Sequence, residues 1–247
     1  MAINTKVALV TGANKGIGHE IARQLARLGF TVFAGARDPQ RGEAGAERLR
    51  EDGLDVRSVE LDVTRAATIL AAARLIEREA GRLDVLVNNA GIVILRSPPA
   101  VLSADDVRTV YETNVFGVIA VTQAMIPLLE KSAAGRIVNI SSTLGSLAAA
   151  SDPDRPTSSA AYATSVALAY STSKTALNAV TVCFANQLRD TGIKVNAACP
   201  GHVGTDLNRF EGKRTVQQGA REPVRLATLG ADGPTGGFFD ENGPKPW

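Results

Sequence analysis

The stretch from Val7 to Phe30 reads VALVTGANKGIGHEIARQLARLGF, and it decides the fold of the chain. Its first part, VALV, is a short continuous apolar run, which is typical of a strand buried on both faces of a parallel sheet. From Ile21 onward the apolar residues recur with the spacing of one helix face. Gly12, Gly16 and Gly18 separate these two parts. The stretch therefore predicts a strand, a glycine turn and a helix.

Glycines at the start of a helix suit the binding of a phosphate group. A helix N-terminus presents unpaired N–H groups and partial positive charge, so it attracts anions. Glycines allow the chain to turn sharply and let a phosphate approach the backbone closely. The alternative is a turn that only needs flexible residues, because a lone glycine motif matches many chains by accident.

The rest of the chain alternates short apolar runs with segments of helical periodicity. Strands are predicted at 7–10, 31–35, 55–60, 84–87, 135–140, 193–197 and 235–239, and helices at 16–28, 39–52, 64–80, 103–130 and 168–190. This alternation predicts an α/β fold with a doubly wound parallel sheet covered by helices on both faces. A length of 247 residues fits a single domain, residues 1–247. Two stretches break the rhythm: an insertion at about 146–168, and a substrate-loop region, without regular structure, at about 203–230.

Composition argues against several classes of function. The net charge is +2 and lysine and arginine form no run, so we expect no nucleic-acid partner. No apolar stretch approaches membrane-spanning length, and Met1–Asn4 lead directly into the first strand, so we expect a cytoplasmic protein without a membrane contact. Cys183 and Cys199 lie in apolar surroundings and are expected to be buried free thiols. No His, Cys, Asp or Glu cluster has ligand spacing, so no metal site is predicted.

Tyr170 and Lys174 stand four residues apart on a predicted helix, so they share one face. A free tyrosine has a pKa of about 10, and a nearby ammonium group lowers that value. The pair therefore suits acid–base catalysis near neutral pH. The alternative is a surface contact between the two side chains. Tyr162 is a rival for Tyr170, but Val166 rather than a lysine stands four residues after it.

The segment after the second predicted strand reads GARDPQRG, from Gly35 to Gly42. Sites that bind NAD place Asp or Glu there to hydrogen-bond the ribose 2′-OH, whereas this chain has Arg37, and Arg41 follows one helical turn later. Guanidinium groups bind a 2′-phosphate through charge-assisted hydrogen bonds, and Lys15 adds a third cation. The sequence therefore predicts NADPH as the cofactor. The alternative is that Arg37 and Arg41 are solvated surface charges.

Six motifs, in this order along the chain, resemble the short-chain dehydrogenases/reductases. They are TGANKGIG from Thr11 to Gly18, NNAG from Asn88 to Gly91, Asn114, NISS from Asn139 to Ser142, YSTSK from Tyr170 to Lys174, and PGHVGT from Pro200 to Thr205. Within that family the chain is most similar to the NADPH-dependent carbonyl reductases. The resemblance implies a seven-stranded Rossmann-type sheet and reduction of a small-molecule ketone or aldehyde by hydride transfer from NADPH.

The same resemblance implies a role for each motif residue. Tyr170 donates a proton, Ser142 rather than Ser141 binds the carbonyl oxygen, and Lys174 also binds the nicotinamide ribose. Asn114 holds a water molecule that relays protons, or alternatively it only braces a helix. NNAG lines the cofactor or, alternatively, braces the sheet. The cofactor-binding residues implied by the resemblance are Gly12, Asn14, Lys15, Gly16, Ile17, Gly18, Arg37, Arg41, Asp62, Val63, Asn89, Ala90, Gly91, Tyr170, Lys174, Pro200, Gly201, Val203 and Thr205.

Two other functions fit the same motifs, because ketoacyl reductases and alcohol dehydrogenases belong to the same family. A third alternative is a regulator that senses NADP without catalysis. Such proteins tend to lose the tyrosine or the lysine, and both are present here. The stretch between Ser142 and Tyr170 is longer than is usual in the family. We expect residues 160–169 to form a short docked helix that covers the helices at 103–130 and 168–190, through which relatives pair, and so to give a monomer. The alternative is a flap at the substrate site, which leaves a dimer or a tetramer possible.

Overall fold

Strand β1 (Val7–Thr11) lies inside an eight-stranded sheet in the computed structural model, which describes residues 5–94, 102–152, 154 and 157–247, without the side chains of 157–167. The other strands are β2 (Thr31–Ala36), β3 (Val56–Glu60), β4 (Val85–Asn88), β5 (Arg136–Ile140), β6 (Lys194–Ala198), β7 (Phe238–Asp240) and β8 (Gly243–Pro244). The helices are α1 (Gly16–Arg27), α2 (Pro39–Glu51), α3 (Ala66–Ala80), α4 (Ala104–Tyr111), α5 (Gly117–Leu129), α6 (Leu147–Ala150), α7 (Thr157–Gln187) and α8 (Val216–Ala227).

The strand order is β3-β2-β1-β4-β5-β6-β7-β8, and every neighbouring pair from β3 to β7 is parallel. This order reverses direction between β1 and β4, as in a doubly wound fold, so the predicted fold class is confirmed. The predicted number of strands is one too low. The two-residue strand β8 pairs antiparallel with β7 and is too short to leave an apolar pattern in the sequence.

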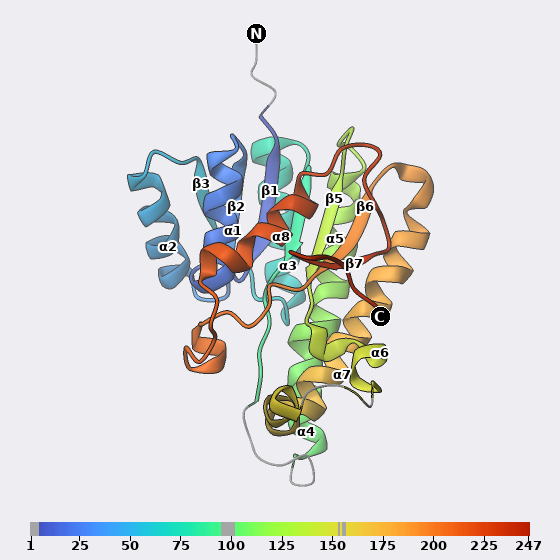
Figure 1. Cartoon of the computed structure of the whole chain (residues 1–247). Helices are drawn as coiled ribbons and strands as arrows, with labels where there is room; N and C mark the ends of the chain where they lie inside the picture. Colours follow the sequence, from blue (N-terminus) through green and yellow to red (C-terminus); the bar gives the residue numbers. More distant parts are fainter. Residues whose placement is uncertain (1–4, 95–101, 153, 155–156) are drawn as a thin grey trace.

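Helices cover both faces of the sheet (Figure 1). One core cluster joins α1, α2 and α8 to the strands and includes Ile21, Leu49 and Val224. The other joins α3, α5 and α7 to the opposite face and includes Ile76 and Met125. The strands are buried on both faces because each face is covered, which accounts for the continuous apolar runs in the sequence. The sequence motifs at the ends of these strands consequently have positions that the core fixes.

The glycine turn brings α1 close to the end of β4. Gly12 and Gly16 have φ of 64° and 61°, a region that side chains other than glycine rarely adopt. At Gly18 an added Cβ would lie 2.3 Å from Asn89 Nδ2 and 2.5 Å from the Gly12 carbonyl oxygen. Gly18 is therefore required for close packing between α1 and the chain that leaves β4.

The predicted helix at 103–130 is present but is interrupted by one π-helical turn, Glu112–Phe116, between α4 and α5. The stretch Ala104–Leu129 is long and apolar enough to cross a membrane by length and composition alone. The prediction that no apolar stretch approaches that length is therefore wrong. Half of the most apolar 18-residue segment in Ala104–Leu129 is buried inside the protein. Helix α5 contributes Val121 and Met125 from this stretch to the core.

Three further predictions need correction. The region at 203–230 is not all loop, because Val216–Ala227 forms helix α8. Residues 160–169 do not form a separate docked helix, because they continue into the stretch that contains Tyr170 and Lys174 as one helix, α7. The reason given for a monomer is therefore wrong, and the monomer itself stays a prediction. Cys199 is buried, but Cys183 is exposed on the outer side of α7.

Gly18→Ala tests the close packing of α1. We expect it to lower the free energy of unfolding by about 1–3 kcal/mol, the usual cost of overpacking. Gly230→Ala is the matched control, because an added Cβ there meets nothing within 4 Å and its φ is not in the left-handed region. Urea unfolding of both variants gives the comparison. Equal stability of the two variants would show that α1 does not depend on Gly18.

Candidate active site

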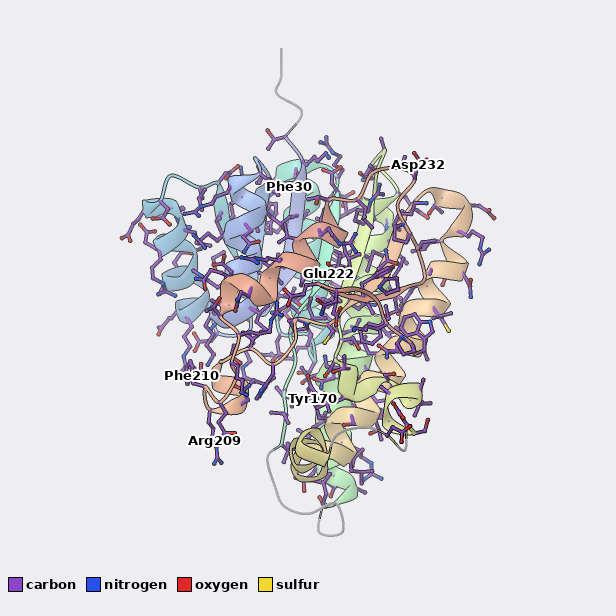
Figure 2. The ribbon with its side chains drawn as sticks, in the orientation of Figure 1. Phe30, Tyr170, Arg209, Phe210, Glu222 and Asp232 are labelled. Carbon is purple, nitrogen blue, oxygen red and sulfur yellow. The ribbon has the colours of Figure 1, made fainter. Side chains whose placement is uncertain are left out.

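A cleft of about 1900 Å³ opens at the carboxyl edge of the sheet, lined by residues that directly follow β1, β4, β5 and β6. It brings together every sequence-predicted site residue except Asn114. The predicted residues that line it are Gly12, Asn14, Lys15, Gly16, Ile17, Gly18, Arg37, Arg41, Asp62, Val63, Asn89, Ala90, Gly91, Ser142, Tyr170, Lys174, Pro200, Gly201, Val203 and Thr205. Figure 2 shows Tyr170 on one side of this end of the molecule and Phe210 on the other.

Asn89 ties the glycine turn to the end of β4. Its Nδ2 donates to the carbonyl oxygens of Thr11 and Gly12, at 2.8 and 3.1 Å. The backbone N–H groups of Asn89 and Ala90 both donate to Thr11 Oγ1, at 3.0 and 2.9 Å. The neighbouring Asn88 instead bonds Thr122 and Asn139 inside the protein. The second asparagine of NNAG therefore fixes the glycine turn, while the first braces the core, in line with the bracing alternative.

The predicted cations lie around the part of the cleft next to β2. The Arg37 side chain is exposed in the cleft wall, and it makes no hydrogen bond or ion pair with any of the described residues. Arg41 is exposed and lies near Asp38, with Nε and Oδ2 3.5 Å apart. Lys15 forms an ion pair with Asp206, which comes from the segment after β6. Of these three cations, Arg37 is therefore the one without a carboxylate partner among the described residues.

Asp62 and Val63 follow β3 at the same edge. The Asp62 carboxylate accepts hydrogen bonds from the backbone N–H and the hydroxyl of Thr64, at 3.0 and 2.7 Å. These two bonds orient the carboxylate. Val63 is 8% exposed and packs closely on Gly117. A Cβ added at Gly117 would lie 2.8 Å from Val63 Cγ2. Asp62 and Val63 therefore line this part of the cleft in fixed positions.

Tyr170 and Lys174 face each other on α7. The Lys174 ammonium lies 5.6 Å from the centre of the Tyr170 ring and donates to the Ile140 carbonyl oxygen at 2.6 Å. Lys174 is only 4% exposed, and burial lowers its pKa to about 8. Burial also raises the pKa of the Cys199 thiol, so the site holds no thiolate near neutral pH. The rival residue Tyr162 has a side chain outside the described residues.

The two adjacent serines after β5 have different environments. Ser141 is 1% exposed, and its hydroxyl donates to Asn178 Oδ1 at 2.5 Å. Ser142 is half-buried, and its Oγ accepts a hydrogen bond from the Leu144 N–H at 3.2 Å. The hydroxyl hydrogen of Ser142 therefore remains available to the cleft, whereas that of Ser141 is used inside the protein.

Asn114 lies in the π-helical turn behind the cleft and is fully buried. Its Oδ1 accepts from the Ile92 N–H at 2.8 Å, and its Nδ2 donates to the Ile92 carbonyl and to Ser173 Oγ, at 3.0 and 3.1 Å. Such π-turns are frequent at functional sites. The amide therefore holds the chain after β4 against α7, as the bracing alternative predicts. An amide oxygen can accept two hydrogen bonds, and among the described residues Oδ1 accepts one, so one acceptor position remains.

The segment after β6 closes the cleft from the other side. Gly201 has φ of 76°, and Thr205 begins a short 3-10 turn, Asp206–Asn208, with reciprocal hydrogen bonds to Asn208. Arg209 and Phe210 then adopt left-handed backbone, with φ of 53° and 63° (Figure 2). Consecutive residues in this region are strained unless surrounding structure holds them there. Phe210 is 67% exposed at the tip of this loop.

Several residues that shape the site could not be found from the motifs. Thr11 belongs to the glycine motif, but its hydroxyl acts on β4, which follows far along the chain. Ser173 lies inside YSTSK, yet its contact with Asn114 joins residues 59 positions apart. Asp206 and Lys15 are 191 positions apart. The sequence signal for each is its place within or beside a motif, because the pairings themselves depend on the tertiary fold.

Comparison with known proteins agrees with this geometry. The family model described as "short chain dehydrogenase" matches residues 6–154 and 155–215. The chain is 36% identical to "Short-chain dehydrogenase/reductase 1" of Saponaria officinalis, over 98% of this chain and 96% of that protein. It is 33% identical to "Carbonyl reductase [NADPH] 1" of Rattus norvegicus, over the whole of both chains. The crystal structure of NADPH-bound carbonyl reductase from chicken fatty liver has a TM-score of 0.85, with 32% identity over 98% of this chain and 99% of that one.

The lowered pKa of Lys174 predicts a pH-dependent contribution to stability. The folded state releases this proton near pH 8, whereas an unfolded lysine releases it near pH 10.5, so the folded state gains stability between these values. Lys174→Met removes the titration. We expect the free energy of unfolding of the wild type, minus that of the variant, to rise by about 3 kcal/mol over this pH range. Urea titrations measure it, and a constant difference would rule out a buried, titrating Lys174.

Proposed function

Because this chain belongs to the short-chain dehydrogenase/reductase family, we propose that it reduces a ketone or an aldehyde with NADPH. The observation that carries the proposal is the buried Lys174 ammonium beside the Tyr170 ring, at the edge of a cleft that also contains Ser142. A cation beside a phenol favours the phenolate, which gives an acid–base group suited to neutral pH. The substrate is a small molecule that reaches this end of the cleft.

The cleft fits a phosphorylated dinucleotide. Gly12 and Gly16 open the backbone at the N-terminus of α1, where N–H groups and the helix dipole favour a phosphate. Arg37, Arg41 and Lys15 would surround a 2′-phosphate, and Asp62 would contact the adenine end. A carbonyl reductase from rat carries NADPH in its name, and the similar chicken structure contains it. Bound NADPH would supply a hydride to the carbonyl carbon.

The protein's own residues would handle the proton. The Tyr170 hydroxyl would give its proton to the carbonyl oxygen as that oxygen becomes an alkoxide. The Ser142 hydroxyl would donate a hydrogen bond to the same oxygen, because its own Oγ accepts only from Leu144 in the described residues. Lys174 would stabilise the resulting phenolate and bind the ribose. The Ile140 carbonyl holds the Lys174 ammonium in place for both tasks.

Asn114 and the segment after β6 would support this centre. Asn114 would keep Gly91 and Ile92 in position beside Lys174, and its remaining acceptor position would hold the proposed relay water. Pro200, Gly201, Val203 and Thr205 would flank the nicotinamide, because they follow β6, next to β5 with its Ser142. Asn89, Ala90 and Gly91 would line the middle of the cofactor.

Arg37→Ala tests the choice of cofactor. A charged hydrogen bond contributes about 1.5–3 kcal/mol, so we expect NADPH to bind about ten-fold or more weakly while NADH binding changes little. Arg41→Ala is the matched comparison, and its effect should be smaller because Asp38 already lies beside Arg41. Fluorescence titration of both cofactors with the wild type and each variant measures the six constants. Equal weakening of NADPH and NADH by Arg37→Ala would overturn the assignment.

Tyr170→Phe tests the acid–base role. We expect NADPH binding and folding to stay nearly unchanged while turnover falls by about 10²–10⁴-fold. Tyr162→Phe, which changes the rival residue in the same helix, should keep its activity. Oxidation of NADPH with a panel of ketones and aldehydes measures turnover. A wild type that binds NADPH but turns over no carbonyl compound would point to the non-catalytic sensor instead.

A further inference from the structure

The turn after β6 separates two cavities. Cys199, Pro200 and Gly201 line the large cleft and also line a second cavity of about 30 Å³. Arg214 and Glu241 line only the small cavity. The turn is therefore a thin wall, with the proposed cofactor site on one side and these two side chains on the other.

Arg214 lies directly against the back of this wall. Its backbone N–H donates to the His202 carbonyl at 3.1 Å, and its own carbonyl accepts from the Gly204 N–H at 3.0 Å. At Gly201 an added Cβ would lie 2.7 Å from Arg214 Cδ. The aliphatic part of Arg214 thus fills the space behind Gly201, and its backbone pairs with the residues on either side of Val203.

Glu241 holds the guanidinium group in this position. The Glu241 carboxylate accepts from both Nη1 and Nη2 of Arg214, the latter at 2.6 Å, and Nη2 also donates to the Gln218 carbonyl at 3.1 Å. Bidentate pairs of this kind fix orientation as well as distance. The ion pair keeps the pKa of Glu241 below its usual range and raises that of Arg214.

These contacts connect the wall to two neighbouring strands. The wall begins at the end of β6, and Arg214 connects it to Glu241. Glu241 directly follows β7, which pairs with β6. This connection holds the wall to the sheet on both sides. It is located at the part of the cleft nearest Ser142, because β6 neighbours β5, and away from Arg37 after β2.

We propose that Arg214, held by Glu241, is a positioning residue that fixes the Pro200–Val203 turn against the reacting half of the cofactor. This inference rests on the proposed NADPH-dependent function. Arg214 does not line the cleft, so it would act only through the turn. Misplacement of the reacting half by an ångström is enough to reduce turnover by up to about 10²-fold.

Two ligands distinguish positioning from a general loss of structure. NADP⁺ would span the whole cleft, whereas adenosine 2′,5′-bisphosphate carries only the adenosine half with its 2′-phosphate. We expect Arg214→Gln to weaken NADP⁺ binding about ten-fold and to lower kcat, while adenosine 2′,5′-bisphosphate binds within about two-fold of the wild type. Calorimetric titration measures both affinities.

Three further variants complete the test. Glu241→Gln should reproduce the loss in part, and Arg214→Lys should restore part of it, because a lysine keeps the charge but not the bidentate pair. Lys245→Gln is the matched control, since it breaks the 2.9 Å ion pair with Asp240 beside the same hairpin turn. It should leave both affinities unchanged. Thermal unfolding of each variant confirms that the protein compared is folded.

Three results would overturn the inference. They are equal weakening of both ligands by Arg214→Gln, no weakening of NADP⁺, and a Lys245→Gln effect as large as that of Glu241→Gln. A failure of the proposed function has a different signature in the wild type itself. The wild type would then bind neither NADP⁺ nor adenosine 2′,5′-bisphosphate, or it would bind both and turn over no carbonyl compound.

Discussion

The close approach of α1 to the end of β4 is the constraint on which the rest of the structure depends. Gly18 leaves no room for a side chain between the helix and Asn89, and Asn89 in turn holds the Thr11 and Gly12 carbonyls. This contact points the N-terminus of α1 into the space between β1 and β4, where the strand order reverses. The cleft lies at this point, which is where doubly wound sheets generally bind their ligands.

Burial of Lys174 is a second constraint, and it connects stability with function. An ammonium group that is almost fully buried is disfavoured, as its lowered pKa shows. It donates a hydrogen bond to the Ile140 carbonyl at 2.6 Å, and among the described residues no carboxylate neutralises it. An apolar residue at position 174 would avoid this cost, but this chain has a lysine there, beside the Tyr170 ring. Active sites often retain such locally unfavourable groups because the chemistry needs them.

The sequence predicts the parts of this protein that depend on local pattern. The strand, turn and helix from Val7 follow from apolar spacing and glycine, and the predicted site residues other than Asn114 meet in one cleft. Helix α8 is absent from the sequence prediction because its stretch contains glycine and many charged residues, although Thr215 and Gln218 form a capping box. Gly219 is needed there because an added Cβ would lie 2.5 Å from Val203. Pairs such as Arg214 with Glu241 join distant segments and leave no local pattern.

The most direct test of NADPH-dependent carbonyl reduction is the transfer of deuterium from NADPH labelled at C4 of the nicotinamide. Both C4 epimers are supplied in turn, with a panel of ketones and aldehydes, and the alcohols are analysed by mass spectrometry. The predicted result is one deuterium on the carbinol carbon from one epimer of NADPH, and much slower transfer from labelled NADH at the same concentration. Alcohols without label from either epimer, or equal transfer from NADH, would contradict the proposed reaction or its cofactor.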